Sequence, residues 1–157
     1  MTNIKQYILP LDNVDLTKIL SSWTWLVDTD KSVVALTKAG DAILKDTNNK
    51  LYFLDIGGGE INLISANYLD FTEGKLSEEV IEELLLPILV DKLENNNIRL
   101  KLGQVYSYTM LPILGGAYDE KNMFAVDLYE HYNLTGEIHF QIKDLPDGAN
   151  VKIETEK

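Results

Sequence analysis

The chain has 157 residues, of which 45% are hydrophobic and 25% are charged, which is the composition of a globular protein rather than a disordered or fibrous one. Its formal net charge of −11 is opposite in sign to the basic surface that nucleic-acid binding requires, and it repels anionic membranes. We therefore expect no nucleic acid and no membrane among its partners, and a basic protein to be attracted.

The absence of cysteine excludes disulfides, thiolate nucleophiles and zinc–thiolate sites. The first ten residues lack the long apolar segment of a signal peptide. The longest apolar run, Leu84 to Val90, is too short to span a membrane. We expect a cytoplasmic protein without a cofactor.

The first half of the chain is expected to form a short helix followed by antiparallel strands. Apolar residues at helical spacing predict a helix over 13–23 with Asn13 as its cap. Strands are predicted at 31–37, 42–45, 51–56 and 60–65, separated by turn-type clusters at hairpin spacing. Together they predict a meander with one face in water, in which Gly57 to Gly59 form a mobile hairpin turn.

The middle of the chain is expected to be helical. A short helix is predicted at 66–74, where Tyr68, Leu69 and Phe71 are candidates for burial. A longer one is predicted at 76–97 with Ser77 as its cap, from apolar residues at positions i, i+3, i+4 and i+7. Pro87 lies inside this helix and is expected to kink or split it.

The last third is expected to contain two strands and a long helix. Strands are predicted at 104–110 and 122–126, with a turn at Pro112 and Gly115-Gly116 where positive φ is needed. Asp127 and Glu130 have capping-box spacing and predict a helix over 128–142, which Gly136 weakens. The residues of this helix expected to face inward are Leu128, Tyr129, Tyr132, Ile138 and Ile142. A final short strand is predicted at 151–153.

These elements predict an α+β fold: an antiparallel sheet of about 5–7 strands with helices packed on one side. The helices include a kinked one near 77–95 and a C-terminal one near 128–142. We expect one compact domain over 1–157, with possible sub-lobes at 1–75 and 76–157.

No residue pattern in the sequence indicates catalysis or a metal site. His131 and His139 are eight residues apart, which places them about 12 Å apart along a helix, too far for one metal ion. Solvation or packing is the expected role of both. Glu130 and His131 are adjacent and point about 100° apart, so a capping role for Glu130 is favoured over acid–base chemistry.

Other candidate sites also have simpler explanations. The segment 28–32 opens like a calcium loop, but it lacks the required glycine and the final glutamate. The segment 57–60 lacks the ending of a phosphate loop and precedes a strand, so it is expected to be a turn. An acidic binding surface is the remaining possibility, with Asp55, Glu60, Asp70, Glu73 and Asp119 as candidate members.

Two segments, 103–116 and 121–131, resemble the C-terminal domain of a family of type VI secretion immunity proteins. The pattern comprises a Gly-Gln-x-Tyr strand, a Pro-x-Leu-Gly-Gly turn, an asparagine and a Leu-Tyr-Glu-His helix start. The matching residues are Gly103, Gln104, Tyr106, Pro112, Leu114, Gly115, Gly116, Asn122, Leu128, Glu130 and His131. Residues 35–45 resemble a segment of a GAD-like domain that often precedes this domain.

The resemblance implies a protein that binds and blocks a cognate toxin, best described for DNase effectors, and that has no enzymatic activity. The motif residues, with Asp127, are expected to shape the chain rather than to contact the toxin. Tyr118, Asp119 and Tyr132 are the candidate contacts, the tyrosines on condition that they are exposed. Two alternatives are a regulatory or scaffold module and an enzyme with a carboxylate site, which requires a cleft with two converging carboxylates of raised pKa.

Overall fold

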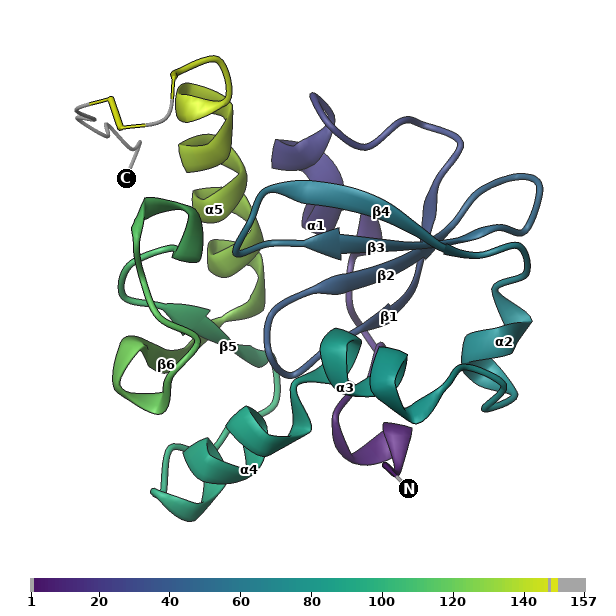
Figure 1. Cartoon of the computed structure of the whole chain (residues 1–157), viewed down its shortest axis with the longest axis horizontal. Helices are drawn as coiled ribbons and strands as arrows, with labels where there is room; N and C mark the ends of the chain where they lie inside the picture. The colour runs from purple at the N-terminus through teal and green to yellow at the C-terminus, as the bar shows by residue number, and fades with distance from the viewer. Residues whose placement is uncertain (1, 147, 150–157) are drawn as a thin grey trace.

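The computed structural model describes residues 2–146 and 148–149 and shows two antiparallel sheets surrounded by helices (Figure 1). The larger sheet has the order β1-β2-β3-β4, and the smaller pairs β5 with β6. The strands are β1 (Ser32–Leu36), β2 (Ala42–Lys45), β3 (Leu51–Asp55), β4 (Glu60–Ser65), β5 (Gln104–Tyr108) and β6 (Met123–Asp127). The helices are α1 (Leu16–Leu20), α2 (Leu69–Thr72), α3 (Glu78–Leu85), α4 (Pro87–Asn95) and α5 (Leu128–Ile142). Short 3₁₀ turns occupy Ile4–Gln6, Ser21–Trp23, Pro112–Leu114 and Glu120–Asn122.

The α+β class and the meander are confirmed, whereas the single sheet is not. The predicted strands 42–45 and 60–65 coincide with β2 and β4, because local turn residues set the hairpins. Gly40, in the turn between β1 and β2, has φ +100°, and the Asp46 carboxylate accepts the backbone N–H groups of Asn48 and Lys50 in the next turn. The small sheet joins the meander through one backbone hydrogen bond of 2.9 Å, from Tyr106 N to Lys38 O.

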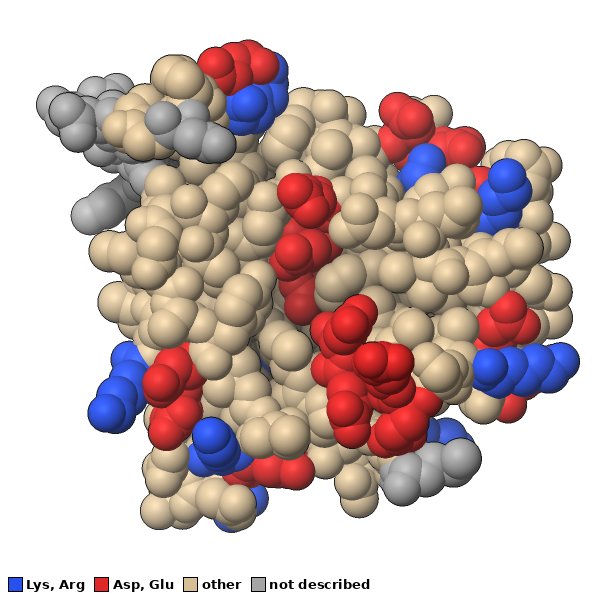
Figure 2. All heavy atoms as spheres, in the orientation of Figure 1, with Lys and Arg blue, Asp and Glu red and all other residues tan. Residues whose placement is uncertain are grey.

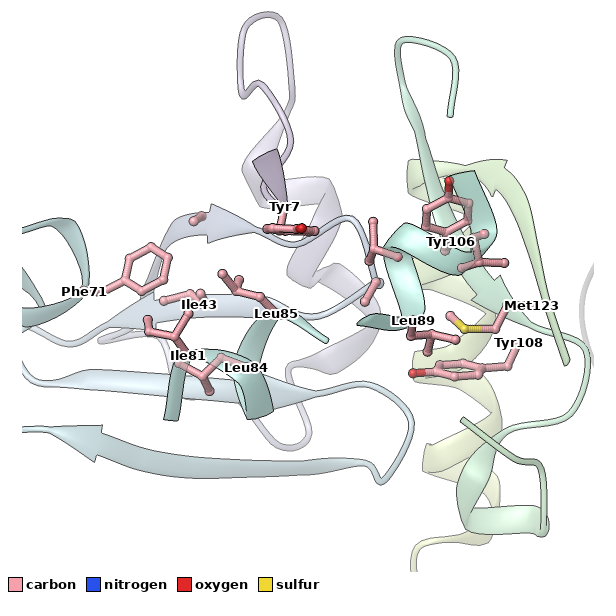
Figure 3. Close-up of a cluster of buried hydrophobic side chains, with 14 of the residues drawn as sticks. Tyr7, Ile43, Phe71, Ile81, Leu84, Leu85, Leu89, Tyr106, Tyr108 and Met123 are labelled. Atoms are coloured by element: carbon pink, nitrogen blue, oxygen red, sulfur yellow. The ribbon is translucent and has the colours of Figure 1, made fainter. Parts of the chain in front are cut away.

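The expectation that one face of the meander is exposed to water is wrong for β1 and β2, because helices cover both faces of these two strands, whereas β4 keeps exposed residues. On one face, Leu36, Ala42 and Leu44 pack with residues of α1 and α5. On the other, Ala35 and Ile43 pack with residues of α2 and α3, as Figure 3 shows for part of this cluster. The continuous apolar run in β2 is the signal of a strand buried on both sides.

The predicted break at Pro87 is confirmed. Ser77 caps α3 by accepting the N–H of Val80, and the helix ends at Leu86, which takes a left-handed conformation with φ 48°. Pro87 then occupies the first position of α4, where its missing N–H is harmless. The two short helices pack their apolar sides into one cluster.

The first helix is shorter than predicted, because Asp15, not Asn13, caps α1. The prediction for α5 is confirmed: Asp127 accepts the N–H of Glu130 and the helix runs over 128–142. Gly136 lowers the helix propensity of α5, but it also allows close packing, because an added Cβ would lie 2.5 Å from the carbonyl oxygen of Ser22.

The predicted strand at 151–153 lies outside the described residues. Within the residues that are described, no helix is long and apolar enough to cross a membrane.

Candidate functional site

His131 joins the two sheets from inside the protein. Its Nε2 lies 2.8 Å from the carbonyl oxygen of Gly40, which can only accept, so Nε2 carries the proton. Its Nδ1 lies 2.7 Å from the hydroxyl oxygen of Ser107. Because Nδ1 carries no proton in this tautomer, it accepts a hydrogen bond from the Ser107 hydroxyl. Burial lowers the pKa of His131 to about 4, so the ring is neutral at physiological pH. His131, for which the sequence predicts only solvation or packing, connects the turn before β2 to β5.

Tyr132 also lies inside the protein, which corrects the expectation that it contacts a partner. Its side chain is 0% exposed, and its hydroxyl donates to the carbonyl oxygen of Asp41 at 2.9 Å. The indole of Trp23 donates to the backbone oxygen of Tyr132 at 2.9 Å. The apolar spacing along α5 predicts that this position faces inward, and the structure shows that Tyr132 is fully buried.

The other motif residues hold the backbone around β5 and β6. Gly103 has φ +83° and accepts the N–H of Leu128, the first residue of α5. The Gln104 side chain accepts the N–H of Lys101 at 2.9 Å, and Tyr106 donates its hydroxyl to Ile98 O.

The twin glycine makes the turn that follows the first 3₁₀ helix of the β5–β6 connection. Gly115 has φ +101°, and Gly116 lies so close to Met110 that an added Cβ would overlap its carbonyl oxygen. Pro112 begins that 3₁₀ helix, and Asn122 closes the loop by exchanging hydrogen bonds with the Met110 backbone. These contacts lie within the β5–β6 connection and stabilise its backbone.

The connection between β5 and β6 presents apolar side chains to solvent. Tyr118 is 50% exposed, and Met110 and Ile113 are exposed on the same segment. Tyr118 also borders a pocket of about 280 Å³ between this loop and the α3–α4 break. The pocket is lined by Glu82, Leu86, Pro87, Ile88, Leu89, Lys92, Tyr118, Asp119 and Glu120. An exposed aromatic ring beside an apolar pocket with an acidic rim is a typical protein-docking surface.

A row of carboxylates crosses the end of the meander. Asp55 pairs with Glu60, so their side chains lie on the same face of the sheet. The register that pairs Ala42 with Leu54 places Asp41 beside Asp55, one position further on. Figure 2 shows acidic side chains over the sheet and α3, with some receding into a hollow between them. We call Asp41, Asp55 and Glu60 the carboxylate row.

Asp41 is the buried end of this row. It is 3% exposed, and its carboxylate accepts the N–H of Ile56 at 2.9 Å. Burial, reinforced by the negative charge of Asp55, raises the pKa of Asp41 well above its usual value. The sequence indicates Asp55 and Glu60 as acidic candidates but not Asp41. Pairing the predicted strands 42–45 and 51–56 as a hairpin aligns Asp41 with Asp55.

The remaining acidic candidates lie elsewhere. Asp70 accepts a hydrogen bond from Ser65, at the opposite end of β4 from Glu60, and Glu73 follows α2. Asp119 lines the Tyr118 pocket. Over the described part of the chain, no three acidic or histidine side chains are grouped closely enough to hold a metal ion.

His139 is the second buried histidine. Its Nε2 donates to the carbonyl oxygen of Ile56 at 2.7 Å, and its ring packs 5.4 Å from that of Trp23. Burial lowers its pKa. Gly59 packs so close to this ring that an added Cβ would lie 2.4 Å from its Nδ1, so the glycine turn is held against α5.

Comparison with known proteins bears on the second half of the chain. Residues 65–139 match the family described as T6SS immunity protein Tdi1, C-terminal. The match supports membership of the type VI secretion immunity family. The matched region runs from the end of β4 into α5 and includes the Tyr118 loop. The resemblance of residues 35–45 to a GAD-like domain lies outside this region and stays a prediction.

The fold resembles a solved structure titled "Crystal structure of Atu4351 from Agrobacterium tumefaciens". The TM-score is 0.52 at 18% sequence identity, which shows a shared fold alone. The alignment covers 77% of this chain and 63% of the other, so this chain spans less than two thirds of that protein. No curated protein matches the sequence.

Proposed function

We propose that this protein is an immunity protein that neutralises a cognate type VI toxin by binding it directly, and that the toxin is a DNase. The family match over residues 65–139 carries the proposal, because that family is described as immunity proteins. The match includes the loop with Tyr118 and Asp119, which we propose as partner contacts. We propose that the protein acts in the cytoplasm, where a DNase would reach the chromosome.

The surface chemistry suits a basic partner. A DNase needs a basic face to hold its substrate, and a chain with net charge −11 attracts such a face over a long range. Tyr118 would supply the apolar anchor, because its exposed ring borders the pocket between the loop and α4. Neutralisation then needs no chemical step: the bound immunity protein covers the surface to which DNA would bind.

Co-expression tests the proposal directly. Each toxin gene found beside this gene is expressed alone, with the wild-type protein, or with a variant, and cell survival and co-purification are measured. We expect the wild type to rescue growth and to co-purify with one toxin. Tyr118→Ala should weaken binding about tenfold or more, because exposed aromatic anchors dominate interface energies.

Leu102→Ala is the matched control, because Leu102 is 89% exposed and lines a different pocket from Tyr118. It should bind and protect like the wild type. Absence of both co-purification and rescue for every neighbouring toxin would overturn the proposal. If Tyr118→Ala binds the toxin as tightly as the wild type, the interface does not include Tyr118.

Stoichiometry separates this proposal from an enzyme with a carboxylate site. Asp41 is a carboxyl of raised pKa beside a second carboxylate, which is one part of the arrangement an acid–base enzyme needs. A binding protein should abolish the DNase activity of the purified toxin at about one equivalent. An enzyme that inactivates the toxin would do so at far less than one equivalent, with a loss of activity that progresses with time.

A further inference from the structure

We propose that the carboxylate row and Tyr108 form a slot that takes an arginine side chain of the basic partner. The identity of that partner rests on the proposed function, whereas the slot itself rests on three observations. The first two concern groups that are left in an unfavourable state in the free protein and that one guanidinium group would relieve, and the third concerns the spacing of the carboxylates.

The first observation is the hydroxyl of Tyr108. In the described part of the chain it is the buried side-chain polar atom that lacks a hydrogen-bond partner, and its residue is only 7% exposed. Figure 3 shows the Tyr108 hydroxyl pointing away from Met123 and toward the meander. Asp41, Asp55 and Tyr118 are near enough to act on it electrostatically. A buried hydroxyl without a partner is unfavourable, so its retention calls for an explanation.

The second observation is the arrangement of like charges. Asp55 and Glu60 are direct cross-strand neighbours, and two like charges in that position repel each other. Asp41 extends the row inward beside Asp55. None of the ion pairs found within residues 2–146 and 148–149 involves this row; the lysines that form them are Lys31, Lys38, Lys75 and Lys143. The protein therefore concentrates negative charge here without a cation of its own.

The third observation is the shape of the row, which favours an organic cation over a metal ion. Neighbouring strands are about 4.8 Å apart, so the three backbones span about 10 Å. In agreement, the described residues contain no cluster that could hold a metal. A guanidinium group is planar and has five N–H donors, so it can bond two carboxylates and a tyrosine oxygen together. We therefore assign the slot to arginine rather than to lysine.

Tyr118 completes the slot at the surface. Its ring lies edge-on to Tyr108 with the centroids 5.9 Å apart, and burial, followed by the negative charges of Asp55, Asp41 and Glu60, raises the pKa of Tyr118 to about 12. Its hydroxyl lies above Gly57, where an added Cβ would approach it to 2.9 Å. A cation entering between the carboxylates would pass this ring, whose face favours positive charge. The same residue thus borders both the apolar pocket and the charged slot.

The test with small probes uses the full chain and needs no toxin. Methylguanidinium is titrated against ¹⁵N-labelled protein, with n-butylammonium as a lysine analogue and N-methylurea as a neutral analogue. We expect saturable shifts for the amides of Ile56 and Gly58, whose N–H groups donate to Asp41 and Asp55. Binding should be strongest for methylguanidinium and absent for N-methylurea.

Two variants distinguish a binding role from a structural one. Tyr108→Phe should raise the melting temperature of the free protein by about 2 °C or more, because it removes a buried hydroxyl without a partner. It should also weaken methylguanidinium binding several-fold. Asp55→Asn should abolish measurable binding. Asp28→Asn, a change of equal charge at a side chain that is 87% exposed, should leave binding unchanged.

The outcomes separate this inference from the proposed function. Unsaturable shifts, or equal binding by Tyr108→Phe, would overturn the slot and show that water alone satisfies the hydroxyl. With the toxin, loss of the slot's arginine contact in Asp55→Asn should weaken binding about 30-fold or more. If wild type and Asp55→Asn protect equally, the slot is wrong and the immunity function stands. If the probes bind but no toxin does, the slot stands and the immunity function is wrong.

Discussion

Replacing His131 tests whether its imidazole is held neutral inside the protein. The ring has a pKa of about 4 in the folded chain against 6.5 for an ordinary histidine. A histidine with a lowered pKa contributes stability above its unfolded pKa, and this stability is lost as the pH falls through the folded pKa. The window is therefore pH 6.5 to 4. At 1.36 kcal/mol per pH unit, the contribution lost between pH 7.5 and pH 4 is about 3 kcal/mol.

His131→Gln removes this contribution together with the bonds to Gly40 and Ser107. The variant should therefore be less stable than the wild type at pH 7.5, by about 2 kcal/mol or more. Urea unfolding at several pH values would measure both proteins. Between pH 7.5 and pH 4 the wild type should lose about 3 kcal/mol of stability relative to the variant, so a variant that is less stable by about 2 kcal/mol at pH 7.5 becomes the more stable protein at pH 4. Comparison with the variant cancels the titration of the carboxylates and of His139, which both proteins share.

The direct readout is the ¹⁵N spectrum of the imidazole. We expect the Nε2–H tautomer at pH 7, since Nε2 donates to the Gly40 carbonyl. A difference in unfolding free energy that stays constant from pH 7.5 to pH 4, or a titration midpoint near 6.5, would refute the reasoning. Either result would mean that the ring exchanges with solvent and does not hold the two sheets together.

Two further substitutions test packing and charge. Gly136→Ala should lower the melting temperature although alanine favours helix by about 1 kcal/mol, because its Cβ would lie 2.5 Å from Ser22 O; a rise in calorimetry would show that α5 can move away. Asp41→Asn should raise the urea midpoint at pH 7 and change it little at pH 3. In the wild type, the raised pKa of Asp41 means that its protonated form stabilises the folded protein at low pH. This stability is lost as the pH rises above about 4. An unchanged midpoint at pH 7 would mean that the carboxyl is solvated.

Much of the local structure could be predicted from the sequence, because it depends on neighbouring residues. A proline inside a helix removes a hydrogen bond, so Pro87 separates α3 from α4. Ser77 and Asp127 each cap a helix by accepting a backbone N–H three residues further along the chain. The hairpins of the meander follow from turn residues between short β-rich runs. The misplaced cap of α1 is an error of two residues, within what competing acceptors at Asn13 and Asp15 allow.

The site depended more on tertiary structure. Amphipathic spacing predicted the inward face of α5, but it did not show that His131 would bond to the backbone of Gly40 and Tyr132 to that of Asp41. These pairs are separated by 91 residues, and no local rule relates them. The same holds for Gly136, which a propensity scale treats as a weakness and the packing against Ser22 requires.

The sequence by itself determined the class of fold, the acidic charge and the family motif, since composition, turn residues and capping act over a few positions. Only the tertiary structure decided which side chains the motif buries and which it exposes. It placed Tyr118 on the surface, Tyr132 in the interior, and Asp41 in line with Asp55 beside Tyr108. The physical reason is that strand register and helix packing bring together residues that no sequence spacing connects.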